Sequence, residues 1–368
     1  MKASLTCVLA LASAALLSCG ASQHEVVRKR SADIVDAKRA AVERRGFDRA
    51  AAPVVIVTID GARWQEIFLG TDTQRDKGNT KAPRALLPNL YRLASERGAL
   101  VGSPGRGIIK ATGPNYVSLP GYTEILTGKS PLRCQDNGCP PVTTPTLLDE
   151  AYARGGKVAA FGSWEKLERA VTVAPRRFPV SCGRGGDEKI DPYPGHGDYR
   201  PDFVTAYLAL RYLWEERPDL LFLGLGDPDE YAHRGDYDGY LRSLGFADAI
   251  LGQIFVLLDA MGDRGARTHV VATSDHGRAA TFRDHGGWAP ESGRVWLFAA
   301  GPSIAARGRA RSDEHRLADL APTLRIVMGL DADTAPEAGR PITTLLEPRP
   351  EVVTQAPLKP QPNEPTKP

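Results

Sequence analysis

The chain has little net charge, and no segment beyond its first residues is apolar enough to cross a membrane. Lysine and arginine exceed aspartate and glutamate by only three in 368 residues. Because no basic stripe dominates, nothing supports a nucleic-acid partner. Internal repeats are absent as well. The remaining composition, 42% hydrophobic, is ordinary for a soluble globular protein.

The N-terminal run MKASLTCVLALASAALLSC carries one lysine and then a short apolar stretch. Such a run is typical of an export signal and is too short to span a bilayer as a stable helix. Its end, Leu16-Leu17-Ser18-Cys19, resembles the lipobox of bacterial lipoproteins, in which Cys19 would become the lipidated first residue. Cleavage elsewhere, with Cys19 incidental, is the alternative. We expect an exported protein that meets a bacterial membrane only through a lipid anchor, facing the periplasm or the cell exterior.

Few cysteines follow this signal: Cys134, Cys139 and Cys182. An exported chain meets an oxidising compartment, which permits a disulfide. Cys134 and Cys139 bracket the turn-forming run QDNG and could pair locally, and Cys139 with Cys182 is the other option. Metal ligation by the first two is the weaker interpretation, because no second cysteine pair supports it.

Composition divides the chain into four segments. Residues 1–19 are the signal, 20–50 a charged spacer, 51–347 one globular domain, and 348–368 a Pro-rich polar tail. We expect the tail to be extended and disordered.

Strand-like and helix-like runs alternate within the globular segment. Short apolar runs occur at Val54–Ile59, Val158–Phe161, Leu220–Leu225 and His269–Thr273. Helical patterns occur at Leu87–Arg97, Thr146–Ala153, Phe203–Glu216 and Gly239–Met261. Apolar runs of this length suit strands that are buried on both faces of a parallel sheet. The alternation therefore predicts an α/β fold, a sandwich with a mainly parallel central sheet flanked by helices.

Carboxylates stand just after three of the apolar runs: Asp60, Asp229 and Asp275. Ligands of such sheets gather beyond the carboxyl ends of the strands, so these groups could meet in space. Asp229 and His233 are four residues apart, so one helical turn would let a single cation take both. For Asp60, capping of a helix predicted at Ala62–Phe68 is an equally common role.

Two further histidines accompany these carboxylates. His276 directly follows Asp275, and both could bind one metal only at an irregular strand end. His285 is followed by Gly286 and Gly287, which leave room beside it. A lone histidine is more often a surface or core residue, so the number and order of the clusters carry the argument.

Ser118 opens the run SLPGYTEILTG, which Gly128 ends. With Pro120 near the first turn, this run predicts a helix with Ser118 at its N-cap. Capping alone is the usual role of such a serine. The same geometry places a hydroxyl where backbone N–H groups and the helix dipole favour a phosphate. Metal coordination would make that hydroxyl a nucleophile at neutral pH.

Together these motifs resemble the alkaline phosphatase superfamily, especially its type I phosphodiesterase and nucleotide pyrophosphatase branch. The resemblance covers roughly Val54 to Gly301 and rests on the motifs ID-G, SLPGYTEILTG, D-x-x-x-H, SDHG and HGG. It implies an alkaline-phosphatase-like three-layer sandwich with two metal sites. One site would be formed by Asp229, His233 and His285, and the other by Asp60, Asp275, His276 and Ser118.

The resemblance also implies an activity. We expect a two-metal phosphoric ester hydrolase, a phosphodiesterase or phosphomonoesterase, that forms a covalent phosphoserine at Ser118. Two divalent ions are expected, and zinc is favoured because histidine and carboxylate ligands at low coordination suit it. The expected partner is a small phosphate-ester substrate.

Two pocket residues are suggested by the same resemblance. The branch places an asparagine about twenty residues after the nucleophile to hold a phosphoryl oxygen, and Asn137 lies close to that register; a turn between two cysteines is its other role. Lys166, with Trp164, could line the pocket as in related phosphomonoesterases, although a lysine on a helix surface is commoner.

The motif around Ser118 departs from its relatives. The phosphodiesterase branch has T-F-P-N-H where this chain has S-L-P-G-Y, which puts a nucleotide-type substrate in doubt. Sulfatases carry (C/S)-x-P-x-R, but Tyr122 replaces that arginine, so we do not expect formylglycine. Phosphoglycerate mutases of this superfamily are longer, with a large inserted domain that we do not see in this sequence. Phosphoethanolamine transferases carry transmembrane helices, which we do not see here either. The alternatives are a sulfatase, a phosphonate or phosphoglyceryl hydrolase or a mutase of this superfamily, and a non-catalytic binding lipoprotein with a structural metal.

Overall fold

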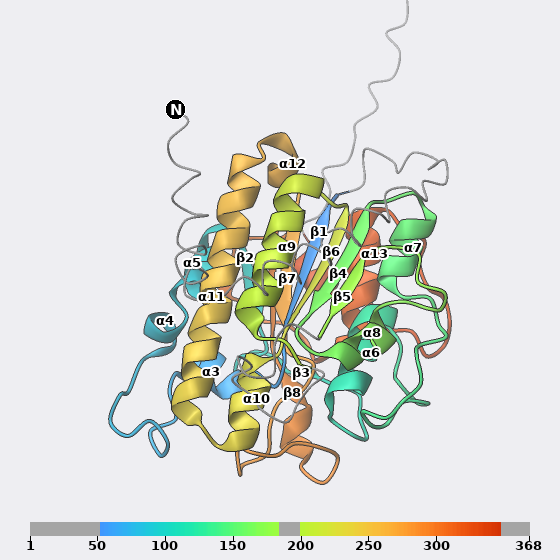
Figure 1. Cartoon of the computed structure of the whole chain (residues 1–368). Coiled ribbons are helices and arrows are strands. Elements are labelled where there is room, and N and C mark those ends of the chain that lie inside the picture. Colours follow the sequence, from blue (N-terminus) through green and yellow to red (C-terminus); the bar gives the residue numbers. More distant parts are fainter. Residues whose placement is uncertain (1–51, 184–198, 347–368) are drawn as a thin grey trace, which may run out of the picture.

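A sheet of eight strands runs through the centre of the molecule, in the order β10-β2-β9-β7-β1-β6-β4-β5 (Figure 1). The structure is a computed structural model that describes residues 52–183 and 199–346. The predicted signal with Cys19, the charged spacer and the Pro-rich tail lie outside the described residues. The strands are β1 (Val54–Ile59), β2 (Gly98–Val101), β4 (Val158–Gly162), β5 (Val180–Cys182), β6 (Leu220–Leu225), β7 (His269–Thr273), β9 (Leu297–Ala300) and β10 (Gly308–Arg309).

The five strands from β7 to β5 are parallel, and β9 runs antiparallel to both β7 and β2. Every residue of β1, β4, β6 and β7 is buried. Continuous apolar runs are required where helices cover both faces of a sheet, which is why the sequence predicted these strands with few errors in their bounds. The predicted fold class, a mainly parallel sheet between helical layers, is confirmed.

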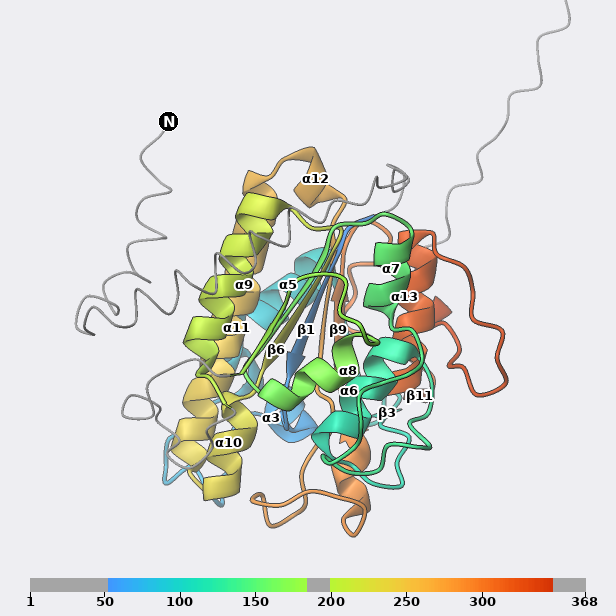
Figure 2. The same ribbon diagram turned by 45° about the vertical axis from the view of Figure 1, so that its right-hand side comes forward.

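Helices form a layer on each side of the sheet (Figure 2). One layer contains α5 (Pro88–Arg97), α9 (Asp202–Glu216) and α11 (Tyr237–Ala260), and the other contains α6 (Ser118–Thr127), α7 (Leu147–Ala153), α8 (Glu168–Val171) and α13 (Leu320–Met328). Side chains of β1 alternate between the two cores: Val55 and Val57 pack on the first layer, and Val54 and Ile56 on the second.

Shorter elements complete the structure. They are α3 (Trp64–Leu69), α4 (Pro83–Leu86), α10 (Asp227–Arg234), α12 (Asp263–Ala266), and a small sheet of β3 (Ile109–Lys110), β8 (Arg294–Val295) and β11 (His315–Arg316).

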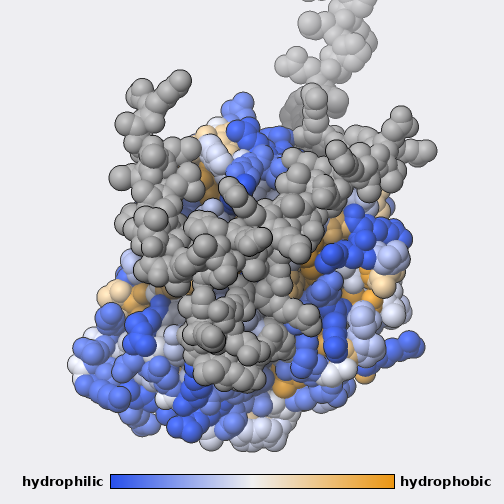
Figure 3. Space-filling model, in the orientation of Figure 1, coloured by the Kyte–Doolittle hydropathy of each residue, from blue (hydrophilic) through white to orange (hydrophobic). Residues whose placement is uncertain are grey.

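Helix α11 corrects one prediction. By length and composition it is apolar enough to cross a membrane, whereas we expected no such segment after the signal. Many of its apolar side chains, among them Leu251 and Ile254, are buried in the core, and the helix packs against α5 and α10. Among the coloured residues of Figure 3, hydrophilic ones dominate the lower part of the face, with hydrophobic ones in small patches. Packing within the core therefore accounts for the composition of α11.

Candidate active site

The candidate site lies beyond the carboxyl ends of three neighbouring strands, β7, β1 and β6. Asp60 directly follows β1, Asp275 lies two residues beyond β7, and Asp229 lies in the first turn of α10 after β6. Parallel strands present their carboxyl ends at one edge, so segments more than two hundred residues apart meet there. This is the edge at which the sequence placed the site.

The structure brings Asp60, Ser118, Asp275 and His276 together as one buried group. The Nε2 atom of His276 lies 3.3 Å from Oδ1 of Asp60 and 3.4 Å from Oδ2 of Asp275. The hydroxyl oxygen of Ser118 lies 3.3 Å from the same Nε2 and 3.5 Å from Oδ1 of Asp60. Donor atoms of Asp60, Asp275 and His276 all lie within 4.8 Å of one another. These are the four residues predicted for one metal site.

The chemistry of this group fits a divalent cation. Oδ2 of Asp275 is buried and forms no hydrogen bond among the described residues, although Nε2 of His276 lies 3.4 Å from it, so this oxygen is available to a divalent cation. Burial and the charge of Asp60 raise the pKa of Asp275 well above its usual value. Burial lowers the pKa of His276, but the carboxylates of Asp275 and Asp60 outweigh it and raise that pKa to about 10. Two carboxylates, an imidazole and a hydroxyl form a donor set that suits zinc.

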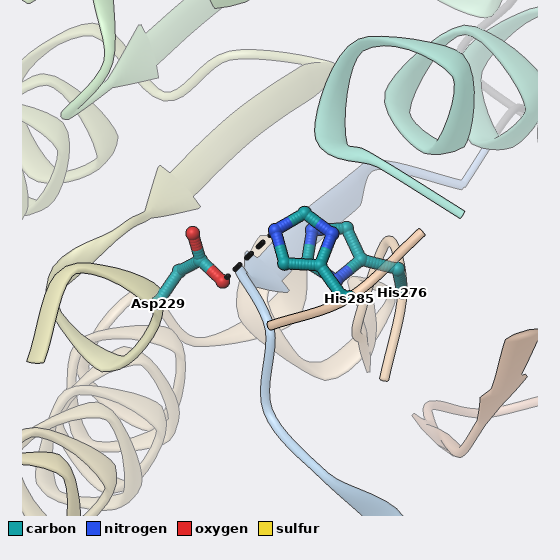
Figure 4. A group of neighbouring side chains, drawn as sticks. All are labelled: Asp229, His276 and His285. Carbon is teal, nitrogen blue, oxygen red and sulfur yellow. Dashed lines mark ion pairs between the residues drawn. The ribbon is translucent and has the colours of Figure 1, made fainter. Parts of the chain in front are cut away.

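A second group adjoins the first and contains Asp229, His233 and His285. Nε2 of His233 lies 3.0 Å from Oδ2 of Asp229 and 3.1 Å from Nε2 of His285. Nε2 of His285 lies 3.9 Å from Oδ1 of Asp229 (Figure 4). The rings of His285 and His276 stack with their centres 3.8 Å apart, so the two groups are in direct contact. The structure thus brings all seven predicted ligands into one cluster.

Backbone carbonyls orient His276 and His285. Nδ1 of His285 donates to the carbonyl of Tyr116 at 2.8 Å, and Nδ1 of His276 donates to the carbonyl of Gly277 at 2.8 Å. Each bond occupies Nδ1 and leaves Nε2 facing the other ligand residues, as metal ligands require. Burial, followed by the charge of His276, lowers the pKa of His285 to about 3. His285 is therefore neutral and ready to act as a ligand.

Arg278 was missed by the sequence analysis. Its buried guanidinium forms an ion pair with Oδ1 of Asp229 and donates to the carbonyls of Phe282 and Arg283. Although burial opposes it, the charges of Arg278 and His233 hold the pKa of Asp229 well below its usual value. The only sequence signal was the position of Arg278 directly after SDHG, and nothing there indicates an ion pair with a residue 49 positions away.

Ser118 is the first residue of α6 and not its N-cap, which corrects the prediction. The N-cap is Val117, and its side chain forms no capping bond. The hydroxyl of Ser118 points instead to Asp60 and His276. Oδ1 of Asn137 accepts from the backbone N–H of Leu119 at 2.9 Å and caps the helix from outside. Asn137 therefore lies beside Ser118, and its side-chain NH₂ donates no hydrogen bond among the described residues.

The departures from the family motif have structural reasons. A Cβ at Gly121 would collide with the backbone carbonyl of Asp275, so the chain needs glycine where the phosphodiesterase branch has asparagine. The hydroxyl of Tyr122 donates to Oδ2 of Asp60 at 2.9 Å. Asp60 caps no helix, since α3 begins after Arg63. Asp227, in the same helix as Asp229, accepts from Tyr199 at 2.6 Å and lies outside the cluster.

A short disulfide loop borders the site. Cys134 and Cys139 form a disulfide with a Cα–Cα distance of 5.4 Å, and Cys182 is a free thiol. This loop carries Asn137 and also Gln135, whose carbonyl accepts from the side chain of Asn115 at 2.7 Å.

Asn115 connects this loop to the ligand segment, because its Oδ1 accepts from the N–H of Gly287 at 2.6 Å. Lys166 is not brought into the cluster by any described contact. Its ammonium lies 5.6 Å from the ring centre of Trp164.

Comparison with known proteins gives matches over part of the chain. A model of the Metalloenzyme superfamily matches residues 205–332, which include Asp229, His233, Asp275, His276 and His285. The 2,3-bisphosphoglycerate-independent phosphoglycerate mutase of Haloarcula marismortui is 29% identical over 203 residues, 53% of this chain and 38% of that protein. The mutase of Ruegeria sp. is 34% identical over 255 residues, 61% and 46% of the two chains. This chain thus spans less than half the length of these relatives.

Solved structures share the fold. A putative sulfatase from Bacteroides thetaiotaomicron superposes with a TM-score of 0.58 at 16% identity, covering 80% of this chain and 74% of that one. A phosphonate monoester hydrolase from Silicibacter pomeroyi gives 0.54 at 18% identity, covering 80% and 76%.

The fold is an α/β sandwich, and two groups of residues at one edge of its sheet could each hold a metal ion. The chain is thus similar over part of its length to the Metalloenzyme superfamily and to phosphoglycerate mutases, and it shares its fold with a sulfatase and a phosphonate monoester hydrolase. Its predicted place in the phosphodiesterase branch stays a prediction.

Proposed function

We propose that the protein hydrolyses phosphoric esters through a covalent phosphoserine at Ser118. The observation that carries this proposal is the position of the Ser118 hydroxyl. It lies at the start of α6, 3.3 Å from Nε2 of His276 and 3.5 Å from Oδ1 of Asp60. His276 is the residue at which the two ligand groups are in contact. A serine with only a structural role would cap its helix, and here Asn137 performs that task.

Two divalent ions, which we propose to be zinc, would be held by the seven residues of the two groups. When bound, they would lower the pKa of the serine hydroxyl and neutralise charge on the phosphoryl oxygens.

The chain's own residues supply the remaining steps. The Ser118 hydroxyl donates toward Oδ1 of Asp60, which orients it, and its proton passes to solvent as the oxygen becomes the nucleophile. The freed oxygen attacks phosphorus, the Oγ–P bond forms, and the bond from phosphorus to the ester oxygen breaks. The leaving alcohol takes up a proton. Water then attacks the phosphoserine, releases phosphate and returns a proton to Ser118.

We assign Asn137 to the phosphoryl group. Its Oδ1 is fixed by the N–H of Leu119, which directs the side chain to the start of α6 next to the nucleophile. The NH₂ group is then the donor available to a phosphoryl oxygen, and it would stabilise the charge that develops there.

A substitution series tests the nucleophile. Ser118→Ala should lower turnover by at least ~10³-fold while metal content stays at the wild-type level. Ser130→Ala, which removes a serine hydroxyl just beyond the same helix, is the matched control and should leave turnover unchanged. Wild-type turnover in Ser118→Ala refutes the assignment.

The ester itself needs a direct comparison. Phosphate monoesters, phosphate diesters, phosphonate monoesters and sulfate esters should be assayed side by side on metal-loaded protein. We expect phosphate esters to be preferred. Tyr122 stands where a sulfatase motif has arginine and is engaged with Asp60, which disfavours a sulfatase. Preferential sulfate release would overturn the phosphoric ester assignment.

We also propose that the protein is exported and anchored through a lipid on Cys19. The Cys134–Cys139 disulfide supports an oxidising compartment. The wild-type chain should fractionate with membranes, and Cys19→Ser should release it.

A further inference from the structure

The two ligand groups differ in charge. The group at Asp60, Asp275 and His276 contains two carboxylates. The group at Asp229, His233 and His285 contains one carboxylate, and Arg278 is already paired with it. A divalent ion would therefore meet excess negative charge at the first group and a partly neutralised carboxylate at the second.

Arg278 is held firmly in this position. Its side chain is 1% exposed, and its donors reach Oδ1 of Asp229 and the carbonyls of Phe282 and Arg283. A Cβ on Gly61 would collide with both Oδ1 of Asp229 and Nη1 of Arg278, so the backbone after Asp60 covers the ion pair. An arginine does not lose its proton in proteins. The positive charge beside Asp229 is thus permanent.

The two groups also differ in the number of ligand atoms that they offer to an ion. Oδ1 of Asp229 is engaged with Arg278, which leaves Oδ2, 3.0 Å from His233. His276 lies within reach of both groups, but its Nδ1 is bonded to the carbonyl of Gly277, so only Nε2 can bind an ion. That Nε2 lies within 3.4 Å of oxygens of both Asp60 and Asp275. The second group therefore keeps one carboxylate oxygen and two imidazoles.

We propose that the protein holds its two divalent ions unequally, and that Arg278 sets the difference. One ion binds tightly at Asp60, Asp275 and His276. The other binds weakly and exchanges at Asp229, His233 and His285, because the Arg278 guanidinium repels a nearby cation and occupies part of its ligand. The positive charge of Arg278 thus neutralises part of the Asp229 charge that the second ion would otherwise neutralise. Arg278 acts through Asp229 and is a positioning residue. The inference concerns metal binding and holds whatever ester the enzyme cleaves.

Metal binding to the full chain tests the inference without any substrate. Protein stripped with a chelator would be titrated with Zn²⁺ by calorimetry, and the metal retained after dialysis would be counted by elemental analysis. We expect one retained ion per chain and a second ion bound at least ~10-fold more weakly. Two ions of equal affinity in the wild type would overturn the proposal.

Paired variants assign the sites. Asp275→Asn should abolish the retained ion, and Asp229→Asn should abolish only the weak one. Retention that depends on Asp229 and not on Asp275 would contradict the proposal. This comparison stands even where an Arg278 variant fails to fold.

Arg278→Met tests the origin of the difference. It should tighten the weak site by at least ~10-fold, and Arg283→Met, which removes an exposed arginine of the same loop, should change neither affinity. An unchanged weak site in folded Arg278→Met would remove Arg278 from the account.

Discussion

The hydroxyl of Tyr122 donates a hydrogen bond of 2.9 Å to Oδ2 of Asp60, one helical turn after the proposed nucleophile Ser118. One rigid helix thus positions both the serine and the carboxylate beside it. Burial, then the charges of Asp60 and Asp275, raises the pKa of Tyr122 well above its usual value. The phenol therefore keeps its proton and remains a donor at neutral pH.

We predict that Tyr122→Phe lowers turnover by roughly 10- to 100-fold, because Asp60 loses the bond that orients it. The stability cost should be only about 1 kcal/mol. Tyr91→Phe is the matched control, since that buried hydroxyl donates to the carbonyl of Ile67. Steady-state kinetics with both variants decide the point. Equal turnover in the two variants means that Tyr122 has no positioning role.

Reduction of the Cys134–Cys139 disulfide should lower activity several-fold. In the loop that it closes, Asn137 accepts a hydrogen bond from the start of α6 and Gln135 accepts one from Asn115. Without the disulfide, the loop would lose more conformational entropy when it becomes ordered around the substrate. The double variant Cys134→Ser with Cys139→Ser should have the activity of the reduced wild type, and reductant should not change that activity. Cys182→Ser should respond to reductant as the wild type does. Full activity after complete reduction, verified by thiol counting, would show that the loop is not needed.

Gly121→Ala should weaken the site. Its Cβ would meet the backbone carbonyl of Asp275, so α6 must move away from the ligand segment or fail to pack. We expect lower thermal stability and loss of the tightly held metal. Gly245→Ala in α11 is the control, because a Cβ there meets nothing within 4 Å; it should be neutral or stabilise by up to ~1 kcal/mol. Wild-type stability and metal content in Gly121→Ala would refute the close packing.

Acid should destabilise the protein partly through His269, the first residue of β7. Burial lowers its pKa to about 4, and its Nε2 accepts from the N–H of Ser303 at 3.2 Å. The unfolded chain takes up a proton near pH 6.5 and the folded chain does not until about pH 4, so the stability held by the neutral ring is lost as pH falls through this window. The loss is on the order of 3 kcal/mol.

His269→Gln should flatten this part of the stability profile, because its amide oxygen can accept the same bond and does not titrate. Denaturant unfolding between pH 7 and pH 4 measures the effect. An acid slope equal to that of the wild type would exclude His269 as its source.

Features set by local pattern were predictable from sequence. The run Val54–Ile59 is continuous and apolar because both faces of β1 are covered, so its bounds were predicted without error. Asp60 and Asp275 could be placed at one sheet edge because parallel strands end there. Local pattern also suggested that Ser118 caps its helix, and here it failed, because Asn137 supplies the cap from a separate loop.

Arg278 could not be found in this way. Its burial depends on an ion pair with Asp229 and on carbonyls that only the folded loop presents. The same holds for α11. Its length and hydropathy would be the same for a helix packed on a sheet and for a helix in a bilayer. Long-range partners decided these cases, and the sequence pattern does not contain them.

The most direct test of the account is to trap the phosphoryl group. Metal-loaded protein turning over a phosphate ester would be quenched in acid, digested and examined by peptide mass spectrometry. The account predicts a phosphoserine at Ser118 in the wild type, and no phosphorylated residue in Ser118→Ala of equal metal content. A phosphoryl group on another residue, or undiminished turnover in Ser118→Ala, would contradict it.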